Sequence, residues 1–124
     1  MDDLKIIIDS FGEKNEEIED DELANIEEEI DSIDEEEYFE LAKISIRFGK
    51  PQILEYLIKN YVFEHNEIEE LCVEIKKFQR SQIIKTKDLR DRENIEDIME
   101  EYDEIIKNWR KLPYRKNNHN SRKF

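Results

Sequence analysis

The sequence predicts an all-α fold, a single-domain bundle of five or six helices, on three observations. Only two Gly and two Pro occur in 124 residues, and so few chain-breaking residues leave little room for the tight turns of a β protein. Apolar residues recur at three- and four-residue spacing in most segments, which is the period of an amphipathic helix. The length suits one domain and is too short for two. We expect an acidic helical domain over residues 1–112 and a basic flexible tail over residues 113–124.

The first third of the chain predicts two helices. The first begins near Asp2 or Asp3 and ends at Gly12, and its apolar positions are Leu4, Ile7, Ile8 and Phe11. The second covers Asn15 to Ile33, where Asp and Glu surround a thin apolar stripe that consists of Ile18, Leu23, Ile26, Ile30 and Ile33. Such a helix can bury only one edge.

The centre of the chain predicts a helical hairpin, around which the rest is organised. Asp34 is suited to cap the first helix because three Glu residues follow it at the positive end of the helix dipole. Gly49 ends this helix, and Pro51 is suited to the first turn of the next. The apolar positions of the two helices are Tyr38, Leu41, Ala42, Ser45, Phe48, Ile53, Leu54, Leu57, Ile58 and Tyr61. So short a connection brings the two apolar faces together.

The run from Ile44 to Ile58 resembles the middle of an ankyrin repeat, in which the first helix ends before a Gly and the second carries an apolar core. The Thr-Pro-Leu-His start of that repeat is replaced by the residues from Glu40 to Lys43. No copy of the pattern lies about 33 residues upstream or downstream, as an array would require. The resemblance covers one helix pair and implies only the local geometry of that pair. It does not imply an ankyrin-type binding surface.

The second half of the chain predicts two longer helices. Asn66 and Glu69 have the spacing of a capping box, and the helix that follows runs to about Ile84 with apolar positions at Ile68, Leu71, Cys72, Ile75 and Phe78. A polar passage from Lys85 to Asn94 separates it from the last helix. That helix has the cleanest pattern, with Ile95, Ile98, Met99, Tyr102, Ile105, Ile106, Trp109 and Leu112 on one side before Pro113 closes it.

The sequence offers no catalytic residue, metal site or cofactor site. Cys72 lies on an apolar helix face, which is typical of a buried structural thiol. His65 and His119 are isolated, so they lack the partners of a zinc site. The chain has no Gly-rich phosphate loop and no nucleophile elbow. A single Cys, no signal peptide and no long apolar run predict a cytoplasmic protein that does not enter a membrane.

The formal charge of −14 is unevenly distributed along the chain. Residues 1–40 contain nineteen Asp or Glu against two Lys, and no basic residue occurs between Asn15 and Ala42. Residues 41–106 contain fifteen acidic against eleven basic residues, and residues 107–124 contain seven basic and no acidic residue. The chain therefore has an acidic pole, a nearly balanced middle and a basic tail. A solvated or partly frayed acidic helix is the plain interpretation of the pole.

The acidic pole can also bind a basic partner. A helix rises about 1.5 Å per residue and duplex DNA carries a charge per about 1.7 Å, so an acidic helix approaches the charge density of a phosphate backbone. In size, charge and lack of chemistry the chain is similar to small bacterial immunity proteins and to phage anti-CRISPR inhibitors. This resemblance implies a non-catalytic inhibitor of a basic nuclease or other nucleic-acid enzyme. The candidate contact residues are Glu27, Glu28, Asp31, Asp34, Glu35, Glu36 and Phe39.

Two other functions stay open. The protein is an adaptor or self-assembling scaffold if the apolar face of the last helix or of the hairpin is shared between chains, in which case acidity serves solubility and a homo-oligomer forms. It binds nucleic acid if the basic tail, interleaved with aromatic residues, contacts phosphates. The residues that would do so are Arg110, Lys111, Arg115, Lys116, Arg122 and Lys123.

Overall fold

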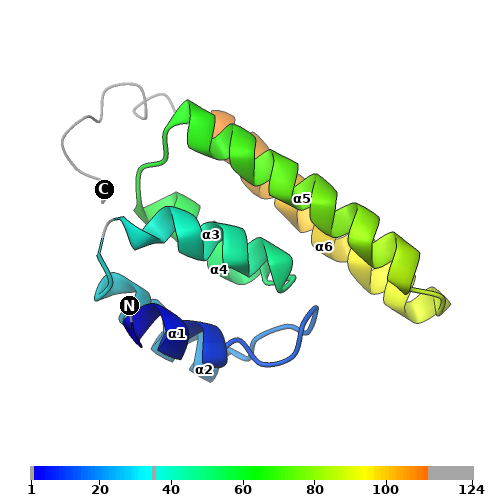
Figure 1. The fold of residues 1–124 in the computed structure, drawn as a ribbon, viewed down its shortest axis with the longest axis horizontal. Coiled ribbons are helices and arrows are strands. Elements are labelled where there is room, and N and C mark those ends of the chain that lie inside the picture. The colour runs from blue at the N-terminus through cyan, green and yellow to red at the C-terminus, as the bar shows by residue number, and fades with distance from the viewer. Residues whose placement is uncertain (1, 35, 112–124) are drawn as a thin grey trace.

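The computed structural model describes residues 2–34 and 36–111, and within these ranges the chain forms six α-helices (Figure 1). In chain order they are α1 (Asp2–Asp9), α2 (Asp20–Asp31), α3 (Glu37–Arg47), α4 (Pro51–Asn60), α5 (His65–Lys85) and α6 (Leu89–Arg110). This arrangement confirms the all-α bundle that the sequence predicts. Pro113 and the predicted basic tail lie outside the described residues.

The helices form three pairs that stack on one another (Figure 1). Within the pairs, α1 packs on α2, α3 on α4, and α5 on α6. Between the pairs, α3 contacts both α1 and α5, and α4 contacts both α2 and α6. Each pair therefore stacks on the previous one with corresponding helices in contact, which is the packing rule of helical solenoids.

The third pair is the longest. Helices α5 and α6 have 21 and 22 residues, whereas α3 and α4 have 11 and 10. The turn between α5 and α6 consequently extends beyond the other two pairs (Figure 1). The segment that joins α2 to α3 lies at the other end of the molecule.

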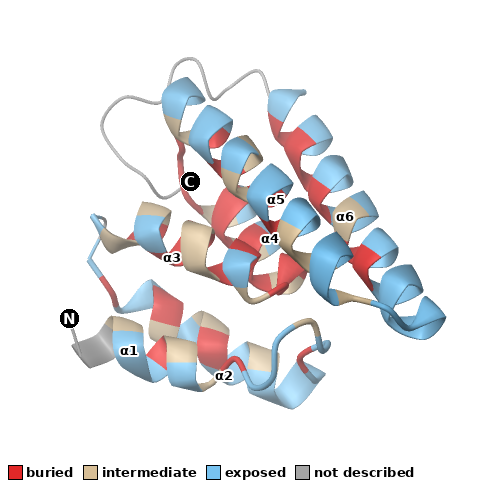
Figure 2. Cartoon of the chain, turned by 45° about the vertical axis from the view of Figure 1, so that its right-hand side comes forward, coloured by how far each residue is buried: buried red, intermediate tan, exposed pale blue. Residues whose placement is uncertain are grey.

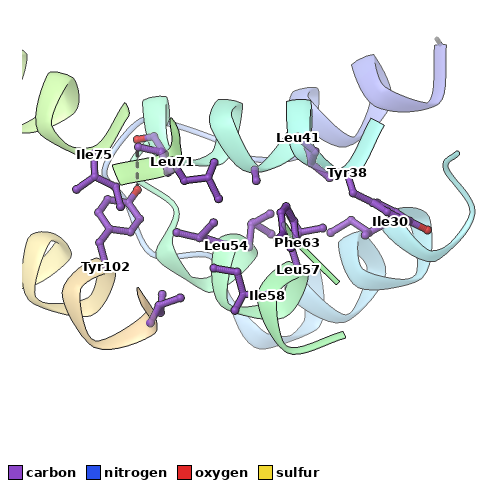
Figure 3. Packing of buried hydrophobic residues seen from close by; sticks show 14 of the residues in the cluster. Ile30, Tyr38, Leu41, Leu54, Leu57, Ile58, Phe63, Leu71, Ile75 and Tyr102 are labelled. Atoms are coloured by element: carbon purple, nitrogen blue, oxygen red, sulfur yellow. Dashed lines mark hydrogen bonds between the residues drawn. The ribbon is translucent and has the colours of Figure 1, made fainter. Parts of the chain in front are cut away.

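The core lies between the helices, whose facing sides are buried (Figure 2). The residues buried there form one apolar cluster. Leu41 of α3, Leu54 of α4 and Leu71 of α5 are fully buried in it (Figure 3). Burial of one such side chain contributes about 1.5–3 kcal/mol. Tyr102 of α6 is also fully buried, and its hydroxyl donates to the carbonyl oxygen of Ile46 at 3.2 Å. This hydrogen bond fixes α6 to the end of α3.

The corner between α3 and α4 has the predicted Gly-terminated geometry. Gly49 adopts a φ of +67°, and its amide donates to the carbonyl of Ile46 at 3.0 Å. The next amide, that of Lys50, donates to the carbonyl of Ser45 at 2.9 Å. These two bonds form a Schellman motif, and Pro51 then begins α4.

Two predicted helix starts are wrong because tertiary contacts or turns take precedence. Helix α2 begins at Asp20 and not at Asn15, since Asn15 adopts a φ of +68° and its amide donates to the carbonyl of Phe48 at 2.9 Å. Helix α3 begins at Glu37 with Glu36 as its N-cap, where Asp34 was expected. The amide of Glu37 donates to the Asp34 carbonyl at 2.9 Å, so a turn precedes the helix.

Two further starts are wrong in the second half. The capping box of α5 consists of Glu64 and Glu67, two residues before the expected Asn66 and Glu69. Helix α6 begins at Leu89, six residues before Ile95, and the Asp88 side chain caps it by accepting from the amide of Arg90 at 2.8 Å. Residues 89–94 are all exposed, so this first part of α6 has no apolar period for sequence analysis to detect.

Candidate functional site

The acidic pole forms an exposed surface on α2 and the segments beside it, which we call the acidic face. The apolar stripe of α2 turns inward, with Ile26 and Ile30 buried and Leu23 partly buried. The other sides of the helix carry carboxylates. The exposed members of the acidic face are Glu16, Glu17, Glu19, Asp20, Asp21, Glu22, Glu28, Asp31, Asp34, Glu36 and Glu40.

Three predicted contact residues lie where a partner can reach them freely. Glu28, Asp34 and Glu36 are exposed, and they lie at the end of α2 and the start of α3. Glu27 is half-buried, and its pKa is raised by burial and by the charge of Asp31. Glu35 lies outside the described residues.

Asp31 is exposed but has a structural task. Its Oδ1 accepts hydrogen bonds from the hydroxyls of Tyr56, at 2.8 Å, and of Tyr61. The Tyr61 ring stacks on that of Tyr38 with 3.9 Å between ring centroids. Burial, followed by the hydrogen bond to Asp31, raises the pKa of both Tyr56 and Tyr61. Asp31 therefore holds the end of α2 on α4, and its replacement would disturb this cluster as well as the acidic face.

Phe39, the apolar member of the predicted contact residues, is not freely exposed. Its side chain is half-buried against the core, and the Lys43 ammonium lies 4.7 Å from the ring centroid. A cation above one side of the ring makes a cation–π contact within the same helix. The prediction of Phe39 as a partner anchor finds no support in this environment.

The segment before α2 is bound to the α3–α4 corner by several hydrogen bonds. The Gln52 side chain donates to the Ile18 carbonyl at 2.9 Å and accepts from the Ile18 amide at 3.0 Å. The buried ammonium of Lys50 donates to the carbonyls of Glu13, at 2.6 Å, and Glu16. Burial lowers the pKa of Lys50, against the opposing attraction of Glu16, Glu13 and Glu22.

The same segment also reaches the third helix pair through one residue. The Asn15 side-chain amide donates to the Gln82 side chain of α5 at 2.9 Å. The Asn94 side chain of α6 donates to the Asn15 carbonyl at 2.8 Å. Asn15 thus connects the first pair to both helices of the third.

A second acidic surface lies beside α6, in a groove of about 780 Å³ that we call the acidic groove. The pKa of Glu101 is raised by burial and then by the charges of Glu17, Glu55 and Asp97. Carboxylates therefore repel one another in this region. The charged side chains that line the groove are all acidic, namely Glu17, Asp97, Glu100, Glu101, Asp103 and Glu104.

A basic surface that the sequence analysis missed extends from the second half of α5 across the turn to the start of α6. Residues 76–92 contain seven basic and two acidic residues, whereas residues 93–104 contain seven acidic and no basic residue. Charges were counted over residues 41–106 as a whole, so the basic and the acidic stretch cancelled to near balance. A count over about 15 residues at a time would have separated them. We call the exposed basic residues the basic tip, namely Lys76, Lys77, Arg80, Lys85, Lys87, Arg90 and Arg92.

Of the residues predicted to bind nucleic acid, the structure describes two. Arg110 and Lys111 are exposed at the end of α6, and the Arg110 guanidinium lies 4.0 Å from the sulfur of Cys72. Cys72 is a free, half-buried thiol. Arg115, Lys116, Arg122 and Lys123 lie outside the described residues, so tail binding stays a prediction.

Within residues 2–34 and 36–111, no group of three or more His, Cys, Asp or Glu side chains is arranged to hold a metal ion. No helix in these ranges is both long and apolar enough to cross a membrane. Comparisons of the chain with protein-family models, with curated proteins and with solved structures gave no match.

Proposed function

We propose that the protein is a non-catalytic inhibitor that binds a basic, nucleic-acid-handling enzyme, such as a nuclease, through its acidic face. One observation carries the proposal: α2 buries a single apolar edge and leaves its other sides covered with carboxylates. Like charges four residues apart on a helix each cost a few tenths of a kcal/mol. A helix that served stability alone would intersperse Lys among them.

The charge of the acidic face suits a surface that holds nucleic acid. Such an enzyme surface is positive, and a −14 protein is drawn to it by long-range attraction that speeds encounter and weakens with salt. The acidic groove presents further carboxylates to the same kind of partner. The inhibitor then blocks the enzyme by occupying its nucleic-acid site, with no chemical step of its own.

The test is affinity capture of the partner from an extract of the source cell on the immobilised full chain. Bound proteins are eluted with a salt gradient and identified by mass spectrometry. We expect a basic nucleic-acid enzyme that is released at moderate salt, and inhibition of that purified enzyme by the free protein.

Charge-reversal variants then locate the contact. Glu28→Lys, Asp34→Lys and Glu36→Lys together change three exposed residues that hold no hydrogen bond to the Tyr61 cluster, and we expect them to weaken binding about tenfold or more. The matched control reverses Asp9, Glu69 and Glu70, which are exposed on α1 and α5, outside both the acidic face and the acidic groove. If the two triple variants bound the enzyme equally well, the acidic face would not be the contact surface.

A second candidate function is that of a self-assembling scaffold, and the observation that favours it is exposed apolar surface at the end of the third pair. Ile84 is 79% and Leu89 is 71% exposed. In a protein that is always monomeric, polar side chains are expected at such exposed positions, and exposed apolar residues are typical of an interaction surface. A strictly monomeric chain at high concentration and low salt would count against this second function.

A further inference from the structure

The basic tip combines positive charge with exposed apolar side chains. Ile83, Ile84 and Leu89 are 51%, 79% and 71% exposed, and they lie among the cations of residues 76–92. A groove of about 650 Å³ between α5 and α6 opens beside Ile83, and Ile95 and Met99 also line it. Its charged lining residues are Arg92 on the side of the tip and Glu96, Glu100 and Asp103 further along α6. Apolar anchors inside a charged rim are the usual composition of a protein-binding surface.

We propose that the basic tip docks on the acidic face of a second copy of this chain, head to tail. The two surfaces are complementary in charge, since the acidic face is formed by a stretch with no basic residue between Asn15 and Ala42. The part of the acidic face that carries Glu28, Asp34 and Glu36 lies near the α2–α3 connection, at the opposite end of the molecule from the α5–α6 turn (Figure 1). A tip therefore reaches these carboxylates on a neighbouring copy.

The contact joins two different patches, so each copy offers one of each. Such a contact either closes reciprocally in a dimer or continues to further copies. Because each whole molecule carries −14, orientations that bring two acidic surfaces together are repulsive, whereas the tip offers seven exposed cations to the acidic face. The charge pattern thereby favours orientations in which the tip of one copy meets the acidic face of the other.

The composition of the tip favours an acidic protein over nucleic acid or an anionic bilayer. Single-stranded nucleic acid stacks its bases on exposed aromatic rings, but the one aromatic residue in 76–92, Phe78, is buried. Duplexes and bilayers extend past the tip, where they meet the seven carboxylates of residues 93–104. The acidic face is a smaller target, because α2 has 12 residues and is about 18 Å long.

This inference goes beyond the proposed inhibition, and the two fail separately. Self-association is measured on the purified chain alone, whereas inhibition requires the captured enzyme. Both use the acidic face, so the tip of one copy competes with the enzyme for the face of another. Reversal of the tip charges is expected to abolish self-association and to leave enzyme binding intact.

The test compares sedimentation velocity of the full chain at about 20 mM and about 300 mM NaCl, where the screening length differs severalfold. We expect association at low salt and dissociation at high salt.

The tip variant carries Lys87→Glu, Arg90→Glu and Arg92→Glu, at and just before the start of α6, where added carboxylates suit the helix dipole. Its self-dissociation constant is expected to rise more than about tenfold. The control Lys5→Glu, Lys59→Glu and Lys107→Glu changes as much charge elsewhere, and associates like the unmodified chain.

Mixing two variants provides the decisive measurement. The face variant (Glu28→Lys, Asp34→Lys, Glu36→Lys) and the tip variant are each expected to be monomeric. In the face variant the new lysines repel the basic tip, and in the tip variant the new carboxylates repel the acidic face. An equimolar mixture restores association, since the three new carboxylates on the tip of one variant oppose the three new lysines on the face of the other. Circular dichroism of each variant verifies that it is folded.

Three results would overturn the proposal. The first is a monomeric unmodified chain at low salt, and the second is a mixture that stays monomeric although both variants are folded. The third is binding of duplex DNA or of vesicles with anionic lipid by the unmodified chain and not by the tip variant, which would assign the tip to phosphate groups instead.

Discussion

Lys50 is the residue at which the segment before α2 meets the α3–α4 corner, and its side chain is 1% exposed. A cation is costly to bury unless hydrogen bonds satisfy it, and here the carbonyls of Glu13 and Glu16 accept from the ammonium. Sequence analysis gives no sign of this, because a Lys before the N-terminal Pro of a helix is ordinarily solvated. The requirement arises only once residues 13–16 lie over the corner.

Replacement of Lys50 tests that requirement. Lys50→Met keeps most of the apolar stem and removes the donor, so the two carbonyls lose their partner. We expect the free energy of unfolding to fall by about 1–3 kcal/mol, as measured by urea denaturation. Lys59→Met on the exposed side of α4 is the control and should change it by less than about 0.5 kcal/mol. Equal effects would show that the Lys50 bonds contribute nothing net.

Glu101 should make stability depend on pH. Its pKa is raised in the folded chain by burial and by neighbouring carboxylates, so the stability associated with its protonation is present below about pH 4.5 and is lost as the pH rises through the raised pKa. Glu101→Gln should therefore be more stable than the unmodified chain at pH 7, by a few tenths of a kcal/mol because solvent screens this group. The difference should close on acidification to about pH 4.5.

Glu74 is the control with the opposite sign. Arg47 donates two hydrogen bonds to it, at 3.1 and 3.3 Å, which lowers the pKa of Glu74. Its contribution is present above about pH 4.5 and is lost as the pH falls through the lowered value. Glu74→Gln should thus destabilise at pH 7. If denaturation curves moved in the same direction for both variants, the local charge environments described for Glu101 and Glu74 would be wrong.

Among the elements, the two glycines with positive φ make a matched pair. Gly12 and Gly49 adopt φ values of +75° and +67°, so Ala costs about 1–2 kcal/mol of backbone energy at either. A Cβ on Gly12 would meet nothing within 4 Å, whereas one on Gly49 would lie 2.2 Å from the Asn15 side-chain oxygen. We expect Gly49→Ala to destabilise clearly more than Gly12→Ala, because Asn15 must move and loses hydrogen bonds. Thermal unfolding of the two variants measures this, and equal shifts would contradict the tight contact.

Helix boundaries marked by Gly, Pro or a break in apolar period were predictable, as the end of α3 before Gly49, the start of α4 at Pro51 and the end of α5 show. Helix α1 begins at Asp2 as expected but ends at Asp9, three residues before the expected Gly12. The starts of α2 and α6 were not predictable, for two different reasons. Asn15 is drawn into bonds with residues 48, 82 and 94, which no local pattern encodes. The first turns of α6 are exposed all round, so only the Asp88 cap marks them. The exposed acidic face was predictable, since a stripe as thin as that of α2 can bury only one edge of the helix. The structural use of Asp31 and the partial burial of Phe39 depend on neighbouring helices, so the sequence did not predict them.

For the whole molecule, repulsion between like charges opposes folding. A net −14 on a chain of this size makes the compact state repel itself, and dissolved salt screens that repulsion. We expect the melting temperature to rise between about 20 mM and about 300 mM NaCl, by several degrees if the gain is about 1 kcal/mol. Differential scanning calorimetry with sodium chloride measures the shift. A melting temperature that fell would mean that attractive ion pairs outweigh repulsion in the folded chain.

The hydrogen bonds of Asn15 to Gln82 and Asn94 also change how the molecule opens. A linear stack of helix pairs couples only neighbours, so its terminal pairs can detach one at a time. Here the first pair is also tied to the third, and release of the first pair breaks contacts at both ends of the stack. Amide hydrogen exchange in α1 and α2 should consequently follow global unfolding more closely than terminal fraying. Because of this bridge, the three stacked helix pairs should unfold more cooperatively than a stack in which only neighbouring pairs are in contact.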